Sequence, residues 1–317
     1  MRKLLLAGLV VVVVLSGAAL WHGWAPDRSV ESLSERWAPP PSQFITVNGL
    51  PVHLRDEGVT DGGRTPLLLL HGTSASLHTW DGWVAALGGE RRVVRFDLPG
   101  FGLTGPVADN DYRMARYVET TLGVMDALGI PRAIIAGNSL GGQIALETAL
   151  AQPQRVSALI LVDSGGYPFE AESMPLGFKL AQISWLKPLT TRLLPRYMIE
   201  ASVRDVYGDP ERVTEQLVDR YYELTLRAGN RAALAERMAQ LGPSADIRRR
   251  IANLSQPTLL LWGEQDRLIP PAVGRQMHAD IANSRWQSFA DLGHVPQEED
   301  AERTAAAVAD FLQRQQL

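Results

Sequence analysis

The chain has 317 residues, of which 45% are hydrophobic and 21% are charged, a composition typical of a folded globular protein rather than a disordered one. Its formal net charge of −4 gives no reason to expect nucleic acid as a partner. The absence of cysteine excludes disulfides, cysteine nucleophiles and thiolate zinc sites, and the histidines form no HExxH pair, so we expect no metal site.

The amino terminus has the pattern of a membrane segment. Two basic residues near the start are followed by the uncharged run Leu4–Leu20. As a helix, Leu4 to Trp24 spans roughly 30 Å, the thickness of the hydrocarbon core of a bilayer. We therefore expect residues 1–24 to anchor the protein in the cytoplasmic membrane, with the domain that follows outside it, in the periplasm. The alternative is a signal peptide cleaved near Ala19, which would yield a secreted or periplasmic protein.

Residues 25–43 have the polar, proline-containing pattern of a tether. The folded part begins after them with a hairpin, in which Phe44–Val47 and Val52–Arg55 flank the turn Asn48-Gly49. Short apolar runs bounded by turn residues then predict buried strands at Leu67–Leu70, Val93–Phe96, Ala133–Ala136, Leu159–Val162 and Thr258–Trp262. The last strand is expected at Arg285–Phe289. Helical patterns lie between or after them at Tyr112–Leu128, Gly141–Ala151 and Ala301–Gln313.

This alternation of strands and helices predicts an α/β fold, with a mostly parallel central sheet and helices on both of its faces. The alternation stops between Asp163 and Pro243, where only helical segments punctuated by proline and glycine occur. We expect residues 164–243 to form a helical cap over the strand ends. The cap would be inserted between two core segments, residues 44–163 and 244–317.

A candidate nucleophile follows the strand predicted at Ala133–Ala136. The residues from Gly137 to Gly142, Gly-Asn-Ser-Leu-Gly-Gly, contain the pattern Gly-x-Ser-x-Gly, and a helix is predicted directly after it. Between a strand and a helix, this pattern is typical of a nucleophile elbow, a strained turn that exposes the serine Oγ. We therefore expect Ser139 to be the nucleophile. The alternative is a glycine-rich helix start that binds an anion.

The loop after the first buried strand predicts an oxyanion hole. His71-Gly72-Thr73-Ser74 follows Leu67–Leu70, where an elbow needs a backbone N–H that faces the nucleophile. The second N–H comes from the residue after the serine. We expect the N–H groups of Thr73 and Leu140 to stabilise the oxyanion of a tetrahedral intermediate. His71 itself is expected to pack behind the loop rather than to act as a base.

The base and the acid that orients it are expected near the carboxyl end. Asp266 follows the strand at Thr258–Trp262, and His294 follows the last predicted strand. A carboxylate on the second ring nitrogen fixes the tautomer of a catalytic histidine. We therefore expect Asp266 to orient His294. Asp163, which ends the strand before the cap, is the competing acid, and Glu264 is a third candidate.

Five motifs taken together resemble one superfamily. HGTS, DLPGFGLTG, GNSLGG, LWGEQD and GHVPQEE occur in this order. From Phe44 to the end, with residues 164–243 as a variable cap, the chain resembles the cap-bearing α/β-hydrolase superfamily. The resemblance implies an α/β-hydrolase fold and a Ser139-His294-Asp266 triad. Some lipases of this fold take their acid from the position of Asp163, so that alternative stays open.

The motifs also bear on the subfamily. Haloalkane dehalogenases and epoxide hydrolases of this fold carry an aspartate nucleophile where this chain has Ser139, which argues against both. The C–C bond hydrolases of meta-cleavage products share the pair Asn138-Ser139. They carry a longer glycine-rich oxyanion loop and usually a tryptophan after the catalytic histidine, whereas this chain has Thr73-Ser74-Ala75 and Val295. The pattern more closely resembles the esterase and lipase branch, including its membrane-anchored bacterial members.

We therefore expect a serine hydrolase that cleaves a small-molecule or lipid-like carboxylic ester through an acyl-enzyme, without metal or cofactor. The alternatives are a C–C bond hydrolase of the meta-cleavage-product type and a non-catalytic binding protein on the same fold. The candidate substrate-pocket residues are Ser74, Asn138, Trp185 and Val295. Further cap aromatics that fit either an apolar pocket or the core of the cap are Phe178, Tyr197, Tyr221 and Tyr222.

Overall fold

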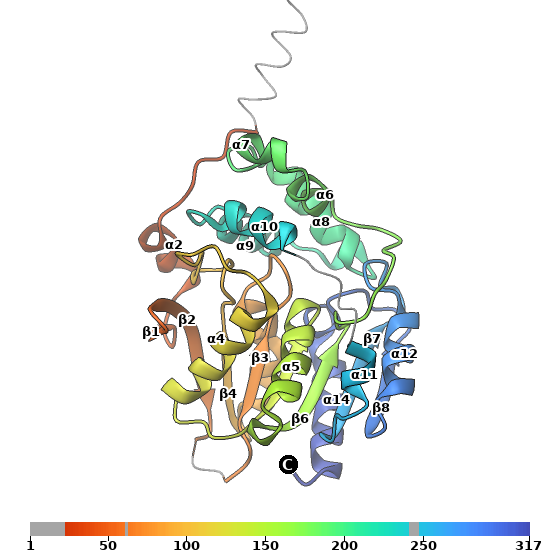
Figure 1. Ribbon diagram of the computed structural model, residues 1–317. Helices are drawn as coiled ribbons and strands as arrows, with labels where there is room; N and C mark the ends of the chain where they lie inside the picture. Colours follow the sequence, from red (N-terminus) through yellow and green to blue (C-terminus); the bar gives the residue numbers. More distant parts are fainter. Residues whose placement is uncertain (1–22, 61–62, 241–246) are drawn as a thin grey trace, which may run out of the picture.

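The computed structural model describes residues 23–60, 63–240 and 247–317. Its strands are β1 (Gln43–Val47), β2 (Leu50–Gly58), β3 (Leu67–Leu70), β4 (Arg92–Phe96), β5 (Ala133–Asn138), β6 (Val156–Val162), β7 (Thr258–Gly263) and β8 (Ser284–Phe289). They form an eight-stranded sheet in the order β1-β2-β4-β3-β5-β6-β7-β8 (Figure 1). β2 runs antiparallel to β1 and β4, and every other neighbouring pair is parallel. The predicted mostly parallel sheet is confirmed.

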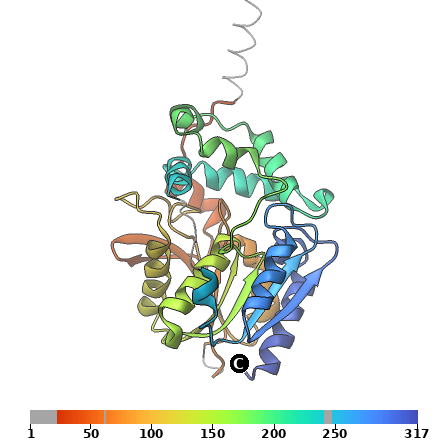
Figure 2. The ribbon, with the colours of Figure 1, turned by 45° about the vertical axis from the view of Figure 1, so that its right-hand side comes forward.

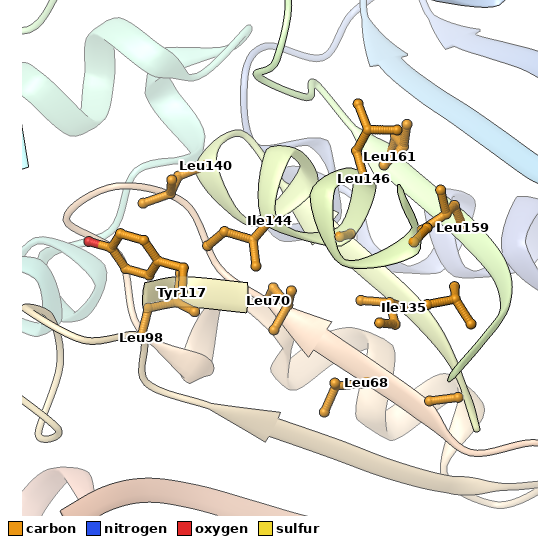
Figure 3. Packing of buried hydrophobic residues seen from close by; sticks show 14 of the residues in the cluster. Leu68, Leu70, Leu98, Tyr117, Ile135, Leu140, Ile144, Leu146, Leu159 and Leu161 are labelled. Carbon is orange, nitrogen blue, oxygen red and sulfur yellow. The ribbon is translucent and has the colours of Figure 1, made fainter. Parts of the chain in front are cut away.

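Helices cover both faces of the sheet, which explains why its central strands are apolar on both sides. The covering helices are α3 (Asp81–Leu87), α4 (Met114–Ala127), α5 (Leu140–Ala151), α12 (Pro271–Asp280) and α14 (Ala301–Arg314). β3 shows the alternation of faces. Leu68 and Leu70 join a buried cluster with α4 and α5 (Figure 3), whereas Leu67 and Leu69 join a second cluster with α3 and α14.

The register of the parallel strands brings their carboxyl ends to one edge of the sheet. Leu70 pairs with Gly137, Asn138 pairs with Val162, and Val162 also pairs with Leu261. The segments that follow β3, β5, β6 and β7 therefore leave the sheet side by side. In parallel sheets this edge is where ligands bind.

The helices between β6 and β7 form a cap over that edge. They are α6 (Leu176–Ala181), α7 (Lys187–Thr190), α8 (Arg196–Val206), α9 (Glu215–Thr225) and α10 (Asn230–Ala239). Figures 1 and 2 show them as a separate layer above the sheet. α11 (Ile247–Ile251) belongs to the core again, where Ile247 and Ile251 join the same buried cluster as α5. The short helices are η1 (Leu77–Trp80), η2 (Pro153–Arg155), η3 (Ser184–Leu186), η4 (Pro210–Arg212) and α13 (Pro296–Glu299).

The segment expected to be a tether, residues 25–43, contains a helix that packs against the cap. In α2 (Val30–Trp37), Leu33 and Trp37 lie one turn apart and are buried with Leu224 of α9. The indole Nε1 of Trp37 donates a hydrogen bond to Glu223 at 2.7 Å. Two apolar side chains on one helical face suffice to attach this segment. It is therefore part of the folded body rather than a free tether.

The expected placement in the cytoplasmic membrane requires correction. Among the residues that the structure describes, no helix is long and apolar enough to cross a bilayer. The predicted anchor, residues 1–24, falls outside the described residues except for its last two, Gly23 and Trp24. The structure thus gives no support to membrane anchoring or to a transmembrane helix.

Candidate active site

Ser139 lies between β5 and α5 in a backbone conformation that residues other than glycine rarely adopt. Its φ is 54° and its ψ is −115°, which is a strained region for an L-residue. A Cβ on Gly137 would lie 2.1 Å from the carbonyl oxygen of Gly141, and a Cβ on Gly141 would lie 2.1 Å from that of Leu70. Only glycine at both flanking positions therefore allows a turn this tight.

His294 and Asp266 form a buried pair. The Nδ1 of His294 lies 2.7 Å from Oδ2 of Asp266, and the two residues are only 5% and 2% exposed. The other carboxylate oxygen of Asp266 accepts hydrogen bonds from the N–H groups of Leu268 and Ile269 at 2.8 and 2.9 Å. These bonds fix the carboxylate. Because Nδ1 is engaged, Nε2 is the ring nitrogen that this contact leaves available.

The main chain of His294 is held from two sides. Its N–H donates to the carbonyl of Val206 in α8 at 2.8 Å, and its carbonyl accepts from Nδ2 of Asn138 at 2.9 Å. Asn138 also donates to the carbonyl of Val162 at 3.2 Å. The residue before Ser139 and a cap helix therefore position the histidine together.

Asp163, the competing acid, lies directly beside this pair. One ligand atom each from Asp163, Asp266 and His294 lie within 4.8 Å of one another. The Oδ1 of Asp163 accepts from the N–H of Gly263 at 3.0 Å, whereas its Oδ2 is buried without a hydrogen-bond partner. Burial, and then the charge of Asp266, raise the pKa of Asp163 well above its ordinary value. The carboxyl group that contacts His294 is that of Asp266 rather than that of Asp163. The trio has donor atoms suited to a metal, but the close Asp266–His294 contact is that of a hydrogen-bonded pair.

The loop that begins at His71 passes directly against Ser139. A Cβ on Gly72 would lie 3.2 Å from the Cβ of Ser139. Thr73 follows in this loop, and Leu140 is the first residue of α5, so its N–H has no acceptor within the helix. Both residues line the same cavity as Ser139. His71 packs behind the loop: its Nε2 accepts from the N–H of Leu98 at 2.9 Å, and burial lowers its pKa.

A cavity of about 300 Å³ separates the cap from this edge of the sheet, and Ser139 and His294 both line it. Of the predicted pocket residues, Ser74, Asn138 and Val295 also line it. Trp185 does not line it, and its side chain is 78% exposed. The other lining residues are mostly apolar side chains of the cap, among them Phe178, Leu193, Met198, Ile199, Tyr221 and Leu234.

The structure also brings two cap arginines to this cavity, Arg231 and Arg237, which the sequence analysis did not single out. Both lie on α10, and each is only 7% exposed. A basic residue in a polar helix normally faces solvent, so the sequence gives no signal for their burial.

Comparison with known proteins identifies one family and several relatives. A family described as alpha/beta hydrolase fold matches residues 65–301. A 2-hydroxy-6-oxononadienedioate/2-hydroxy-6-oxononatrienedioate hydrolase of Burkholderia vietnamiensis is 32% identical over 275 residues, which cover 84% of this chain and 92% of the relative. A meta-cleavage product hydrolase of Pseudomonas fluorescens IP01 has a similar structure, with a TM-score of 0.74 and 25% identity over 86% of this chain and 97% of the other. A thermophilic esterase of Thermogutta terrifontis has a TM-score of 0.70 and 25% identity over 86% of this chain and 98% of the other.

Proposed function

Because this chain belongs to the alpha/beta hydrolase family, we propose that it is a serine hydrolase that cleaves carboxylic esters. Ser139 is the nucleophile, His294 is the base, and Asp266 is the acid that orients the base. The proposed substrate is a small-molecule or lipid-like ester, since the cavity is lined mostly by apolar side chains.

In the proposed reaction, Nε2 of His294 takes the proton of Ser139 Oγ as Oγ attacks the ester carbonyl carbon. The N–H groups of Thr73 and Leu140 donate to the oxyanion that forms. The intermediate then collapses, the C–O bond to the alcohol breaks, and His294 gives its proton to the leaving alcohol. Water activated by His294 attacks the acyl-enzyme in the same way and releases the acid. Asp266 stabilises the imidazolium in both halves.

One observation supports this proposal above the others. A serine in a strained turn between strand and helix shares a cavity with a histidine whose Nδ1 lies 2.7 Å from a buried aspartate. A binding protein gains nothing from the strain at Ser139, which costs on the order of 1–3 kcal/mol. A nucleophile gains an exposed Oγ from it.

Labelling with a fluorophosphonate tests the proposal directly. The wild-type protein should be labelled and should hydrolyse p-nitrophenyl esters, whereas Ser139→Ala should lose both activities while staying folded by circular dichroism. Ser202→Ala is the matched control, since Ser202 lines the same cavity but donates its hydroxyl to the carbonyl of Met198. It should still be labelled. Absence of labelling in the wild type would favour a non-catalytic binding protein instead.

The second candidate function is hydrolysis of a C–C bond in a meta-cleavage product. The identity to the Burkholderia hydrolase and the similar structure of the Pseudomonas enzyme support it. The same nucleophile and base would serve both reactions, so Ser139→Ala does not separate them. A direct comparison does: kcat/KM is measured for a 2-hydroxy-6-oxodienoate, through the loss of its visible absorbance, and for a p-nitrophenyl ester. A higher value for the dienoate would replace the ester proposal.

A further inference from the structure

Two buried arginines face a cavity that is otherwise apolar. Among the described residues that line this cavity, Arg231 and Arg237 supply positive charge and no aspartate or glutamate is present. Both arginines lie on α10, and both are more than nine-tenths buried. An apolar cavity with a few convergent polar groups is the usual form of a small-molecule site.

Arg231 is only partly satisfied. One of its terminal nitrogens donates to Asp27 at 2.6 Å and to the carbonyl of Ala25 at 2.7 Å. Its Nε and its second terminal nitrogen, NH1, are buried and have no hydrogen-bond partner. Asp27 therefore balances the charge of Arg231, but N–H donors remain free beside the cavity.

Arg237 has no acidic partner in the part of the chain that the structure describes. Its guanidinium carbon lies 5.5 Å from the ring centroid of Tyr117, and its Nε is buried without a hydrogen-bond partner. Burial lowers the pKa of Arg237, yet an arginine stays charged inside proteins. A contact with an aromatic ring compensates only part of the cost of burying a cation. The part of this cost that remains would be offset by an anion bound beside Arg237.

Arg237 lines the same cavity as Ser139. Tyr117 belongs to the same buried cluster as Leu140, the residue after Ser139, and Figure 3 shows its ring in that cluster with the hydroxyl pointing out of it. Arg237, which lies above this ring, borders the cavity from the cap, and Ser139 borders the same cavity from the sheet. A single substrate can therefore reach both.

We propose that Arg237, assisted by the free N–H groups of Arg231, binds a carboxylate at the end of an apolar substrate whose scissile carbonyl lies at Ser139. This inference rests on the proposed serine hydrolase function and names its substrate class: a half-ester of a dicarboxylic acid or a comparable ω-carboxylated acyl compound. Arg237 has no acidic partner among the described residues, and its one positive charge matches the one negative charge of a carboxylate. A guanidinium also pairs with a carboxylate through two parallel hydrogen bonds.

The test measures binding separately from turnover. In the Ser139→Ala background, calorimetry compares monomethyl suberate with dimethyl suberate, which has the same chain without the charge, and repeats the pair with adipate and sebacate esters. For at least one chain length the carboxylate should bind at least about tenfold more tightly, as expected for a charge-assisted hydrogen bond. Arg237→Met in that background should abolish the preference. Arg314→Met, which removes an exposed arginine paired with Asp310, should leave it unchanged.

The outcomes are distinct for the two proposals. Equal or weaker binding of every carboxylate would overturn the carboxylate site, while labelling and ester turnover by the wild type would still support the serine hydrolase. Preserved preference in Arg237→Met would also overturn it. If Arg237→Met does not fold, Arg237→Gln and Arg237→Lys take its place. The proposal then expects that Arg237→Gln loses the preference for the carboxylate and that Arg237→Lys keeps part of it.

Discussion

Two buried aspartates, Asp163 and Asp266, share one corner of the candidate active site, and their hydrogen-bond partners differ. Asp266 accepts hydrogen bonds from two backbone N–H groups and contacts His294. Asp163 accepts a single backbone N–H and is fully buried next to the carboxylate of Asp266. Burial, and then the charge of Asp266, raise the pKa of Asp163, which favours its protonated form.

This difference predicts how the two asparagine variants rank. Asp266→Asn should lower kcat by a factor on the order of 10⁴, because the amide stabilises the wrong tautomer of His294. Asp163→Asn should lower kcat far less, since the carboxyl that contacts His294 is that of Asp266 and the amide oxygen of asparagine can still accept from the N–H of Gly263. Ester turnover under saturating substrate measures both. A larger loss in Asp163→Asn would move the catalytic acid to the end of β6.

The sequence accounts for some residues of the site and not for others. Ser139 and Asp266 each follow a strand whose apolar run was recognisable, whereas His294 follows the more polar last strand, Ser284–Phe289. Parallel strands deliver the residues at their carboxyl ends to one edge of the sheet. The cap residues follow no such rule. Trp185 was expected in the pocket and is exposed, whereas Arg237 was not expected there and is buried. Which face a cap helix presents depends on tertiary packing that no local pattern encodes.

At the scale of elements, the junction of β5 and α5 tolerates no additional atoms. A Cβ at Gly141 would lie 2.1 Å from the carbonyl oxygen of Leu70, which is a backbone atom that cannot turn aside. We predict that Gly141→Ala destabilises the protein by about 3 kcal/mol or more and reduces fluorophosphonate labelling of Ser139, because overpacking forces the backbone to shift.

Gly89→Ala is the matched control for this prediction. Gly89 lies between α3 and β4, has no neighbour within 4 Å of a new Cβ and does not have a positive φ. Urea denaturation should show almost no change for it, within about 0.5 kcal/mol. Equal losses in the two variants would mean that the elbow is not the tight turn described here.

Glu299 in α13 connects the cap to the loop that carries His294. Its two carboxyl oxygens accept from the N–H groups of Gly293 and Gly208, each at 2.8 Å. Burial nevertheless raises its pKa from 4.5 to about 7. The folded protein therefore holds a proton that the unfolded chain releases between these values. The contribution of Glu299 to stability is largest below this window and falls as the pH rises through it.

Glu299→Gln should remove that pH dependence. Between about pH 5 and pH 8, the unfolding free energy of the wild type should fall by about 1–3 kcal/mol relative to that of the variant. Urea denaturation at both pH values measures the difference. Glu302→Gln, an exposed position on α14, is the control and should track the wild type. A difference that stays constant with pH would show that Glu299 does not retain its proton in the folded state.

At the scale of the whole molecule, the cap is attached to the core at more places than its two connections to β6 and β7. The main chain of His294 bonds to α8 of the cap, and Val295 packs with Val203 and Val218 of the cap. The segment before β1 makes a further attachment. Trp37 makes contacts to both cap and core: its indole donates to Glu223 of the cap, its carbonyl accepts from His78 of the core, and its side chain is buried with Leu103 of the core. Proline-rich composition alone indicated a tether here, because the partners of Trp37 lie far away in the sequence.

Trp37 should therefore contribute strongly to the stability of the cap and core as one unit. Trp37 is 6% exposed, and truncating a buried tryptophan to alanine costs about 3–5 kcal/mol, a large part of the 5–15 kcal/mol that stabilises a typical domain. Trp185→Ala is the matched control, since the side chain of Trp185 is 78% exposed and should cost less than about 0.5 kcal/mol. Urea denaturation gives both values, and limited proteolysis shows where the Trp37→Ala variant opens. We expect new cleavage sites in the cap before any appear in the sheet, because α9 loses the contacts of both Leu224 and Glu223. If the two tryptophan variants lost equal stability, or if the cap stayed protected in Trp37→Ala, the segment before β1 would not hold the cap in place.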